Sequence, residues 1–440
     1  MIFLGVLSFL SALLLLTDGV ILTVKSGFFQ FRHLGIVFKV TIKKLIKGKD
    51  LKGFKVMALA LGSTIGIGNI IGVTSAVLIG GAGAVFWMLI SGFAGMIIKY
   101  AEIYICVKEK NDSGRLSGGP MYVFKHKLSG AFKSLGALFA VVCILASFCA
   151  GNVIQSKSIY RFADIGLNIS PSLITVIVLP LLFLIILGKD RVYQNFSAVF
   201  VPLMSLFYII ALLVIIFSNF KNLPYAVFSV FSGAFGFKSA VGGFSGAVIS
   251  EAIRVGAMKG LFTHEAGMGS SPIAHSSAEN ADPFTQGCWG IIEVFIDTVV
   301  VCMLTALAVL SSPIYLSGEI NDTFTLICRI FESSFGGIGI KLLCISACCF
   351  AFASIVGWSF YGIKALEFLT KNSFAQKIYS VIFVIAVPVS LLINDSLAWM
   401  LTDIFNSTML IINASFLLYF GGDTVKSLSK IRNILEINFK

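Results

Sequence analysis

The sequence predicts an all-α protein that crosses a membrane many times, and three observations support this. Of its 440 residues, 57% are hydrophobic and only 12% are charged, and the mean hydropathy is +0.96. Soluble domains do not have this composition. Apolar runs long enough to span a bilayer recur without a long polar linker, and basic residues collect in the short loops between them. We therefore expect one polytopic membrane domain of about eleven helices.

The first apolar run, at 1–24, lacks the basic start and the small-residue cleavage site of a signal peptide. We therefore expect it to be an extra spanning helix. A basic cytoplasmic loop at 25–55 follows it, then a ten-helix core at 56–420 and a basic cytoplasmic tail at 421–440. The core spans are expected at about 56–80, 84–106, 132–156, 171–188, 195–217, 225–250, 287–311, 340–362, 375–394 and 397–420.

The distribution of basic residues predicts the orientation of the chain in the membrane. With the N-terminus outside, 26 of the 33 Lys and Arg residues lie in or beside cytoplasmic segments. Lys and Arg are enriched in such loops of membrane proteins. We therefore expect a multi-pass protein of the cytoplasmic membrane with its C-terminus in the cytoplasm. The net charge of +12 comes from these loops, so no nucleic-acid partner is expected.

Within the first core span, the sequence Gly66-Ile67-Gly68-Asn69 stands where a membrane helix should be most uniform. Each Gly costs a helix interior roughly 1 kcal/mol relative to Ala, so the helix could break here. A break frees peptide groups, and in lipid each costs several kcal/mol unless it is bonded. This favours a ligand site, although the glycines alone could equally serve close packing between helices.

A second interruption is expected at Val241–Gly246, in the sixth core span. Two broken helices five spans apart are typical of a five-plus-five inverted repeat with a binding site between them, which favours a secondary transporter. The alternatives are an enzyme and a channel. An enzyme would need a paired nucleophile and base or a metal set, and a channel a ring of like charges or a carbonyl filter. The sequence contains neither arrangement.

At this point the residues resemble a known family, the alanine or glycine:cation symporters. The matching segments run in family order along most of the chain and make coincidence implausible. They are Gly66–Ile70, Gly80–Met88, Gly118–Tyr122, Gly151–Gln155, Gly243–Ala247, Glu265–His275, Phe295–Thr298 and Gly357–Trp358.

The resemblance implies the leucine-transporter type of fold for the core. It also implies a secondary active transporter, not an enzyme, that imports a small neutral amino acid, alanine or glycine, with Na⁺ by alternating access. It leaves open which amino acid is carried, whether H⁺ replaces Na⁺, and the oligomeric state. No organic cofactor is expected. The expected partners are the amino acid, the cation and the lipid bilayer.

For the amino acid, the resemblance implies a site on the first, third, sixth and eighth core helices. Amides near the first break are expected to bind the carboxylate, and carbonyls of the second break the ammonium group. The two side-chain amides can donate and accept, although each could instead join one helix to another. The expected substrate residues are Ile67, Gly68, Asn69, Gln155, Gly243, Phe244, Ser245 and Trp358.

For the cation, the resemblance implies a Na⁺ site between the first and eighth core helices. Its expected ligands are the carbonyls of Gly62, Ile65 and Ala351 and the hydroxyl of Ser354. Hard cations bind several oxygens. The family usually has two adjacent hydroxyl residues where Ala353 and Ser354 stand, so this chain lacks one of the pair.

Ionisable residues inside spans are candidates for function. Asp297 is expected to act either as a proton relay or as a buried partner for a neighbouring helix. Lys99 and Glu102 lie three residues apart near the cytoplasmic end of their span, and a mutual ion pair is expected there. His264-Glu265 is the start of a zinc-protease motif, but Met268 occupies the position of the second His, so no such site is expected.

Overall fold

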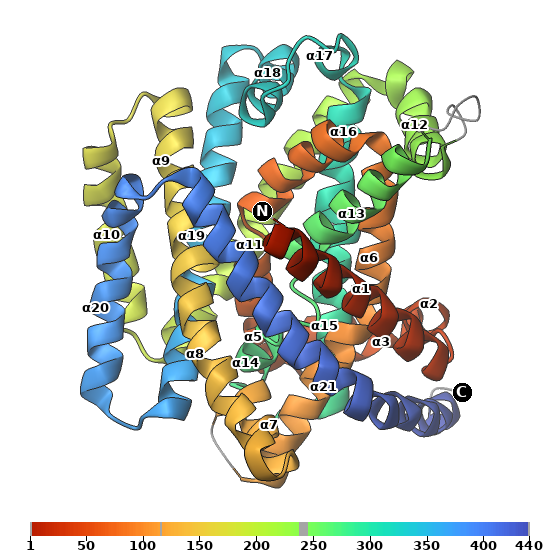
Figure 1. Ribbon diagram of the computed structural model, residues 1–440, viewed down its shortest axis with the longest axis vertical. Coiled ribbons are helices and arrows are strands. Elements are labelled where there is room, and N and C mark those ends of the chain that lie inside the picture. Colours follow the sequence, from red (N-terminus) through yellow and green to blue (C-terminus); the bar gives the residue numbers. More distant parts are fainter. Residues whose placement is uncertain (1, 115–116, 237–244, 439–440) are drawn as a thin grey trace.

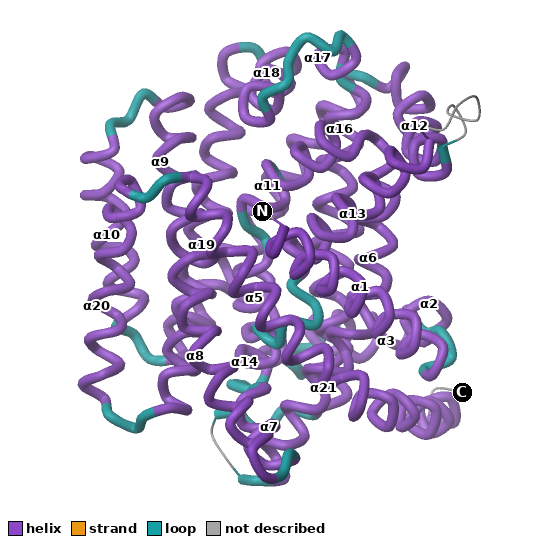
Figure 2. Tube along the Cα trace, in the orientation of Figure 1, coloured by secondary structure: helices purple, strands orange, loops and turns teal. Residues whose placement is uncertain are grey.

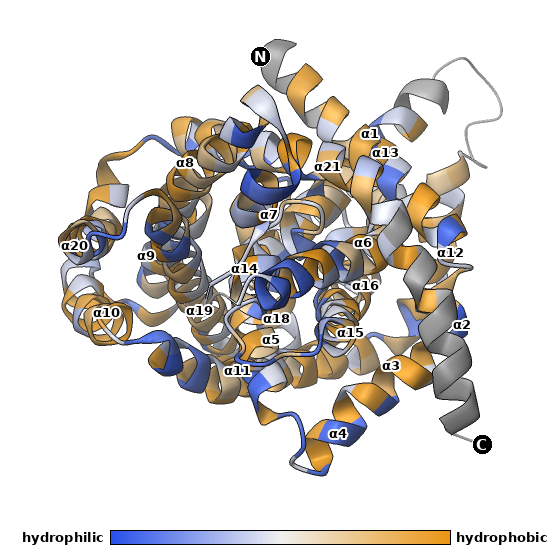
Figure 3. Cartoon of the chain, turned by 90° about the horizontal axis from the view of Figure 1, so that it is seen from below, coloured by the Kyte–Doolittle hydropathy of each residue, from blue (hydrophilic) through white to orange (hydrophobic). Residues whose placement is uncertain are grey.

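The computed structural model describes residues 2–114, 117–236 and 245–438, and these residues form helices and loops without strands (Figure 1). Most loops lie at the two ends of the helical bundle, and further loop segments lie in its middle (Figure 2). Seen from below, α3 and α4 lie at the edge of the bundle (Figure 3). The chain begins with α1 (Ile2–Lys25), α2 (Phe29–Arg32), α3 (Leu34–Val40) and α4 (Ile42–Ile46).

The next membrane crossing is interrupted by a short 3₁₀ helix. The long helix that follows reverses its direction at a glycine. The elements are α5 (Leu51–Thr64), the short 3₁₀ helix η1 (Ile67–Asn69) and α6 (Ile71–Asp112). A straight helix of the 46 residues from 67 to 112 would be about 70 Å long, more than twice the thickness of a bilayer core. Gly81 has φ 69° and ψ −177°, a conformation that L side chains rarely adopt, and it ends the first leg. The chain rises to residue 80 and returns from residue 82 (Figure 1).

The rest of the first half follows the predicted order of spans. A π-helical segment, η3, lies inside the third core helix and separates α8 from α9. The elements are α7 (Pro120–Lys127), η2 (Gly130–Ser134), α8 (Leu135–Phe148), η3 (Cys149–Val153), α9 (Ile154–Leu167), α10 (Pro171–Ile186) and α11 (Asp190–Ser218).

The second half contains the main difference from the predicted spans. The expected span at 225–250 is wrong, because two separate helices, α12 and α13, occupy this region. The sixth core helix is instead α13, continued after a break by α14. The hydropathy of the sequence placed the sixth core span at 225–250 because α13 carries three charged residues. Glu251, Arg254 and Lys259 lower the mean hydropathy of that helix. The elements are η4 (Phe220–Asn222), α12 (Leu223–Phe235), α13 (Ser245–His264) and α14 (Ser271–His275).

The last four core helices follow the prediction. The seventh consists of α15, a π-helical segment η5 and α16, and the short helices α17 and α18 precede the eighth, α19. The elements are α15 (Pro283–Val294), η5 (Phe295–Cys302), α16 (Met303–Ser311), α17 (Pro313–Leu316), α18 (Thr323–Phe335), α19 (Gly337–Leu369), α20 (Ser373–Val389), η6 (Ser390–Leu392) and α21 (Asp395–Asn438).

Many of the helical segments are both long enough and apolar enough to span a membrane. Seven helical segments of the described chain satisfy both conditions, and α10 is a shorter apolar helix. Large apolar side chains face outward from α10 and α11, including Val176, Leu184, Val199 and Phe217, each at least 67% exposed. Such a surface is unstable in water and stable in lipid. The chain is therefore a multi-pass membrane protein.

The extra N-terminal helix packs on the core and does not stand apart. α1 lies against α21 and α6. A Cβ at Gly19 would collide with the side chain of Ala94 on α6, so glycine lets the two helices approach closely. Farther along α1, Leu22 lies against Gly421 of α21. This packing places α1 beside the middle of the bundle.

Candidate functional site

The first helix break lies where the glycines predict it. α5 ends at Thr64, and Gly66 is extended, with φ −128° and ψ −155°. The freed N–H of Gly66 donates to Asn69 Oδ1 at 3.1 Å, and that of Ile67 donates to Gln155 Oε1 at 3.2 Å. Two peptide groups that the break releases are therefore satisfied by side chains, as the bilayer requires.

A second break lies at Glu265–Ser270, between α13 and α14, where none was predicted. The interruption predicted at Val241–Gly246 falls largely outside the described residues. Glu265, Gly267 and Gly269 have positive φ values of 51°, 82° and 77°. These conformations end the helix, and two of them need glycine. The signal for this break was present in the sequence as two glycines beside a glutamate, with Pro272 at the start of the next helix.

A small cavity lies where the two breaks meet. Its free volume is about 10 Å³, close to the space that one water molecule needs, so a ligand can enter only if the walls move apart. The walls come from α5, both breaks, η3, α9, α13, α19 and α21. The lining residues are Ser63, Thr64, Gly66, Gly68, Ala150, Gln155, Phe262, Glu265, Ser354, Trp358 and Asn406.

Several predicted substrate residues meet at this cavity. Gly68, Gln155 and Trp358 line it, and the backbone of Ile67 lies beside it through its bond to Gln155. The side chain of Asn69 is used elsewhere, because its amide nitrogen donates to Asp297 Oδ1 at 2.7 Å. Asn69 therefore holds the first break in shape.

The remaining predicted substrate residues belong to the interruption predicted at Val241–Gly246. Gly243 and Phe244 lie outside the described residues, and Ser245 is the first residue of α13. The described aromatic wall of the cavity on this helix is Phe262, whose ring lies against Gly68.

Sequence reasoning missed several side chains of the cavity, among them an aromatic ring, an amide and a carboxylate. Phe262 ends an ordinary apolar stretch, and Asn406 lies in a helix that gave no signal. Glu265 begins a segment that resembles the family, and its side chain was considered only as part of a failed zinc motif. In the structure its Oε1 accepts a hydrogen bond from Trp358 Nε1 at 3.1 Å, and its Oε2 accepts one from Ser270 Oγ at 2.6 Å. The side-chain oxygen of Asn406 is buried without a hydrogen-bond partner in the described chain.

The expected cation residues lie on two helices in contact. α19 packs against α5, and Gly357 allows this because a Cβ there would lie 2.5 Å from the Cβ of Ser63. Ser354 Oγ donates to the Ser63 carbonyl at 2.8 Å. The last carbonyls of a helix have no partner within it and carry partial negative charge. The Ser354 hydroxyl and the Ser63 carbonyl therefore meet at the end of α5, beside the other carbonyls of its last turn, and oxygen atoms of this kind suit Na⁺.

Behind the second break, a buried ion pair differs from the predicted one. Lys99 Nζ lies 3.1 Å from Glu293 Oε1 on α15 and donates to Ser271 Oγ at 2.6 Å. The predicted partner, Glu102, instead accepts hydrogen bonds from the backbone N–H of Gly269 at 3.1 Å and from Asn413 at 2.9 Å. The expected Lys99–Glu102 pair is wrong because the freed amides of the break compete for the carboxylate of Glu102.

Asp297 connects the first break to the seventh core helix. It lies in the π-helical segment η5, where it accepts hydrogen bonds from Asn69 and, at 2.9 Å, from Thr298. Of the two roles considered for Asp297, this geometry is that of the buried partner. The Asn69 amide thus ties Gly66 and Asp297 together.

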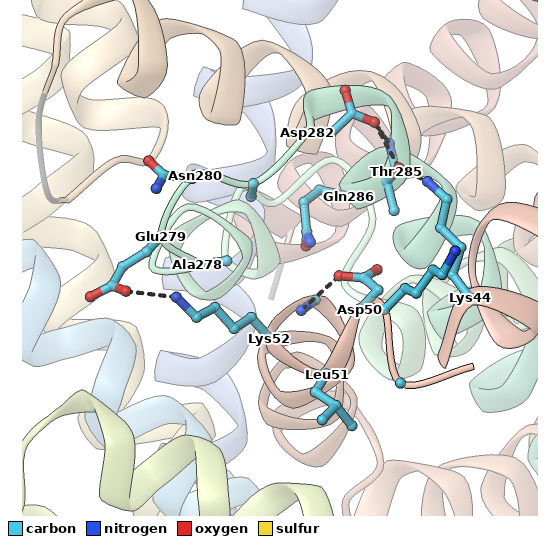
Figure 4. Close-up of a pocket in the computed structure, with 14 residues that line it drawn as sticks. Lys44, Asp50, Leu51, Lys52, Ala278, Glu279, Asn280, Asp282, Thr285 and Gln286 are labelled. Atoms are coloured by element: carbon cyan, nitrogen blue, oxygen red, sulfur yellow. Dashed lines mark hydrogen bonds and ion pairs between the residues drawn. The ribbon is translucent and has the colours of Figure 1, made fainter. Parts of the chain in front are cut away.

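A larger cavity of about 450 Å³ lies at the end of the bundle that carries the basic loops (Figure 4). Contacts across it join α4 and α5 to the segment around α15. Lys52 pairs with Glu279 at 2.8 Å, and Trp289 donates to Asp50 at 2.7 Å. The hydrogen bond and charge of Lys52 lower the pKa of Glu279.

The arrangement has known counterparts. A manganese transporter from Eremococcus coleocola aligns with a TM-score of 0.58 at 13% identity, over 83% of this chain and 77% of that one. MhsT, solved in complex with L-phenylalanine, aligns with a TM-score of 0.52 at 15% identity, over 85% and 91%. The fold is therefore of the leucine-transporter type.

Sequence similarity identifies the family, and with it the class of protein, which is a secondary transporter and not an enzyme. The sequence profile of the sodium:alanine symporter family matches residues 4–436, and the chain belongs to this family. The sodium/alanine symporter AgcS of Methanococcus maripaludis is 34% identical over 434 residues, which cover 95% of this chain and 94% of that protein.

A glycine beside the cavity allows a direct test of its geometry. A methyl group at Gly151 in η3 would overlap the side chain of Trp358, so Gly151→Ala should push the indole into the cavity. Overpacking of this kind costs about 1–3 kcal/mol, which corresponds to a roughly five- to hundred-fold loss of affinity. Calorimetric binding of alanine to the purified variant measures this loss.

The matched control is Gly72→Ala, because a Cβ at Gly72 meets nothing within 4 Å. This variant should bind alanine as the unaltered protein does. Equal affinity of the two alanine variants would contradict the placement of Trp358 in the ligand site.

Proposed function

We propose that this protein imports alanine or glycine together with Na⁺ by alternating access. The observation that carries the proposal is the small cavity between two interrupted helices, which has hydrogen-bond donors on one side and acceptors on the other. An amino-acid zwitterion needs both, because each of its charged groups must be paired or hydrogen-bonded inside a bilayer.

The carboxylate end faces the first break. Backbone amides near Ile67 and Gly68 lie just before α6, so the positive end of that helix dipole points toward them. The N–H of Ile67 already donates to the side-chain oxygen of Gln155. A ligand carboxylate would replace this oxygen as acceptor and turn the Gln155 amide group into a second donor.

The ammonium end faces the second break. Glu265 offers a carboxylate, and the Asn406 side-chain oxygen, buried without a partner in the described chain, offers a further acceptor. Glu265 keeps its hydrogen bond to Trp358 through Oε1. This assignment replaces the predicted carbonyls at 242–245, and it supplies the opposite charge that a cationic group needs in lipid.

The size of the side chains that line the cavity favours a small substrate. Trp358 is buried and Phe262 is partly buried, and a Cβ added at Gly68 would lie only 3.0–3.2 Å from the Phe262 ring. Ala150 lines the same space. A long side chain would require several of these groups to move, whereas a methyl group or a hydrogen requires little space.

The ion-coupling proposal rests on the oxygen atoms at the end of α5. We assign Na⁺ to the carbonyls of Gly62, Ile65 and Ala351 and the hydroxyl of Ser354. The existing bond from Ser354 to the Ser63 carbonyl shows that the two helices are close enough to share an ion. The site adjoins the ligand cavity, because Ser354 lines both.

The function is tested by uptake into proteoliposomes. One Na⁺ entering through about 100 mV supplies roughly 2.3 kcal/mol, and a tenfold gradient adds about 1.4 kcal/mol. Together they can hold an amino-acid gradient of roughly several hundred-fold. Radiolabelled alanine and glycine should accumulate only with an inward Na⁺ gradient. Equilibration without accumulation would contradict a symporter.

Two variants test the cation site. Ser354→Ala should remove the Na⁺ stimulation of uptake, because it deletes the one side-chain oxygen of the proposed set. Ala353→Ser restores the hydroxyl pair usual in the family, and it should lower the Na⁺ concentration for half-activation while the maximal rate stays similar. Uptake is measured against Na⁺ concentration at fixed pH. A wild-type Na⁺ curve for Ser354→Ala would place the ion elsewhere.

We propose that the N-terminus lies outside and the C-terminus in the cytoplasm. Two of the 26 basic residues assigned to the cytoplasmic side, Arg254 and Lys259, lie on α13 and no longer support this orientation, but the loops around α4 and α7 still do. In a cysteine-free background, a cysteine at Asn321 should react with an impermeant thiol reagent added outside. One at Ser373, at the opposite end, should react only after permeabilisation. The reverse pattern would invert the orientation.

A further inference from the structure

Acidic groups outnumber basic ones around the second break. Five carboxylate side chains are buried in the described chain, and Lys99 is the buried cation that lies among them. A charge left without a partner in a bilayer is costly, so a carboxylate there needs a cation, a proton or hydrogen-bond donors. The five residues are Asp18, Glu102, Glu265, Glu293 and Asp297.

Three of these carboxylates have good partners. Glu293 pairs with Lys99, Asp297 accepts bonds from Asn69 and Thr298, and Glu265 accepts bonds from neighbouring side chains. Asp18, on α1, is 1% exposed, and neither of its oxygens has a hydrogen-bond partner in the described chain. No role for Asp18 follows from the amino-acid or cation site.

Glu102 lies on α6, which packs against α1. The two carboxylates repel each other through the buried interior, and Gly19, next to Asp18, allows the close approach of α1 to Ala94 of α6. Glu102 Oε2 accepts two hydrogen bonds, but its Oε1 is buried without a partner in the described chain. Three of the four oxygens of this pair therefore lack donors.

Glu102 also holds the second break in place. Its Oε2 accepts the N–H of Gly269, and Asn413, which donates to the same oxygen, donates to the carbonyl of Gly267 at 3.0 Å. A change of charge on Glu102 therefore acts directly on the backbone of the break. The ligand cavity lies on the other side of that segment, at Glu265.

We propose that Asp18 and Glu102 form a proton-binding site, that the two carboxyl groups together hold one proton, and that this proton is coupled to the conformation of the break at Glu265–Ser270. The bound proton removes the repulsion between two buried carboxylates and supplies an O–H donor for an oxygen that has none. The residual charge stays on Glu102 Oε2, where the amide N–H of Gly269 needs an acceptor.

A proton fits this site better than a metal ion does. A hard cation needs several oxygens around it, and the pair offers three free ones. No group of three or more acidic, His or Cys side chains suited to a metal occurs among the described residues. The groups that face the pair are Lys99 on α6, Glu293 on α15, Glu265 in the break, Asn413 on α21 and His264 on α13.

His264 does not supply the missing positive charge. Its Nδ1 accepts the N–H of Ala266 at 3.0 Å, so that nitrogen carries no hydrogen and the ring is neutral. Lys99 is committed to Glu293 and Ser271. A proton on the pair is therefore the remaining source of charge balance for Asp18.

Infrared spectroscopy of the purified protein in lipid nanodiscs tests the site without any transport assay. The carbonyl band of a protonated carboxylic acid should be present near neutral pH in the unaltered protein. Asp18→Asn keeps the size of the side chain and should remove this band. Asp164→Asn is the matched control, because Asp164 lies on the exposed surface of α9 and its replacement should leave the band intact.

Three outcomes would overturn the proposal. Spectra of Asp18→Asn that match the unaltered protein from about pH 5 to about pH 9 would show that the pair holds no proton in the range of ordinary and raised carboxyl pKa values. A band that appears only when choline replaces Na⁺ would show that Na⁺ occupies the pair. If Asp18→Asn does not fold, Glu102→Gln is measured instead, and an unchanged band there contradicts a shared proton.

The coupling of this proton to the break is tested by uptake and rests on the proposed transport function. In the unaltered protein, alanine uptake at saturating Na⁺ should change with pH over the range in which the infrared band titrates. In Asp18→Asn this pH dependence should be lost, and in Asp164→Asn it should persist. A normal band without any pH dependence of uptake would remove the coupling, whereas failure of all uptake would contradict the transport function and leave the infrared result standing.

Discussion

The structure depends on one constraint: peptide groups released by two helix breaks must find partners inside a bilayer. At the first break, Asn69 and Gln155 accept the freed N–H groups of Gly66 and Ile67. At the second, Glu102 accepts that of Gly269. Without these acceptors each group would cost several kcal/mol, and a continuous helix would be favoured. The first role of these polar side chains in the membrane interior is therefore to bind the peptide groups that the helix breaks release.

The same bonds connect the two halves of the site. Asn69 reaches Asp297 in η5, while Ser271, just after the second break, reaches both Lys99 and Glu293. Both π-helical segments lie next to this network, η3 before Gln155 and η5 around Asp297, where π-bulges are common at functional sites. A ligand that replaces one of these bonds acts on both broken helices at once, which is what coupling between an amino acid and an ion requires.

Local sequence signals and tertiary partners differ in how far they can be predicted. The membrane class and the first break follow from composition and from Gly66 and Gly68, because glycine acts on its own backbone. The span that carries the second break was misplaced because Glu251, Arg254 and Lys259 reduce the apolar signal of its helix. Spacing alone predicted a Lys99–Glu102 pair and missed the amide that binds Glu102, because that amide lies 167 positions away in the sequence.

The central claim is that the amino acid binds between the two helix breaks with Na⁺ beside it. An experimental structure of the protein with alanine and Na⁺ tests it most directly. We predict ligand density between the Ile67 amide, Gln155 and Glu265, with the methyl group toward Phe262 and Trp358 and an ion at the end of α5 near Ser354. Density for alanine outside this cavity, with Gln155 still bonded to the Ile67 amide, would contradict the account.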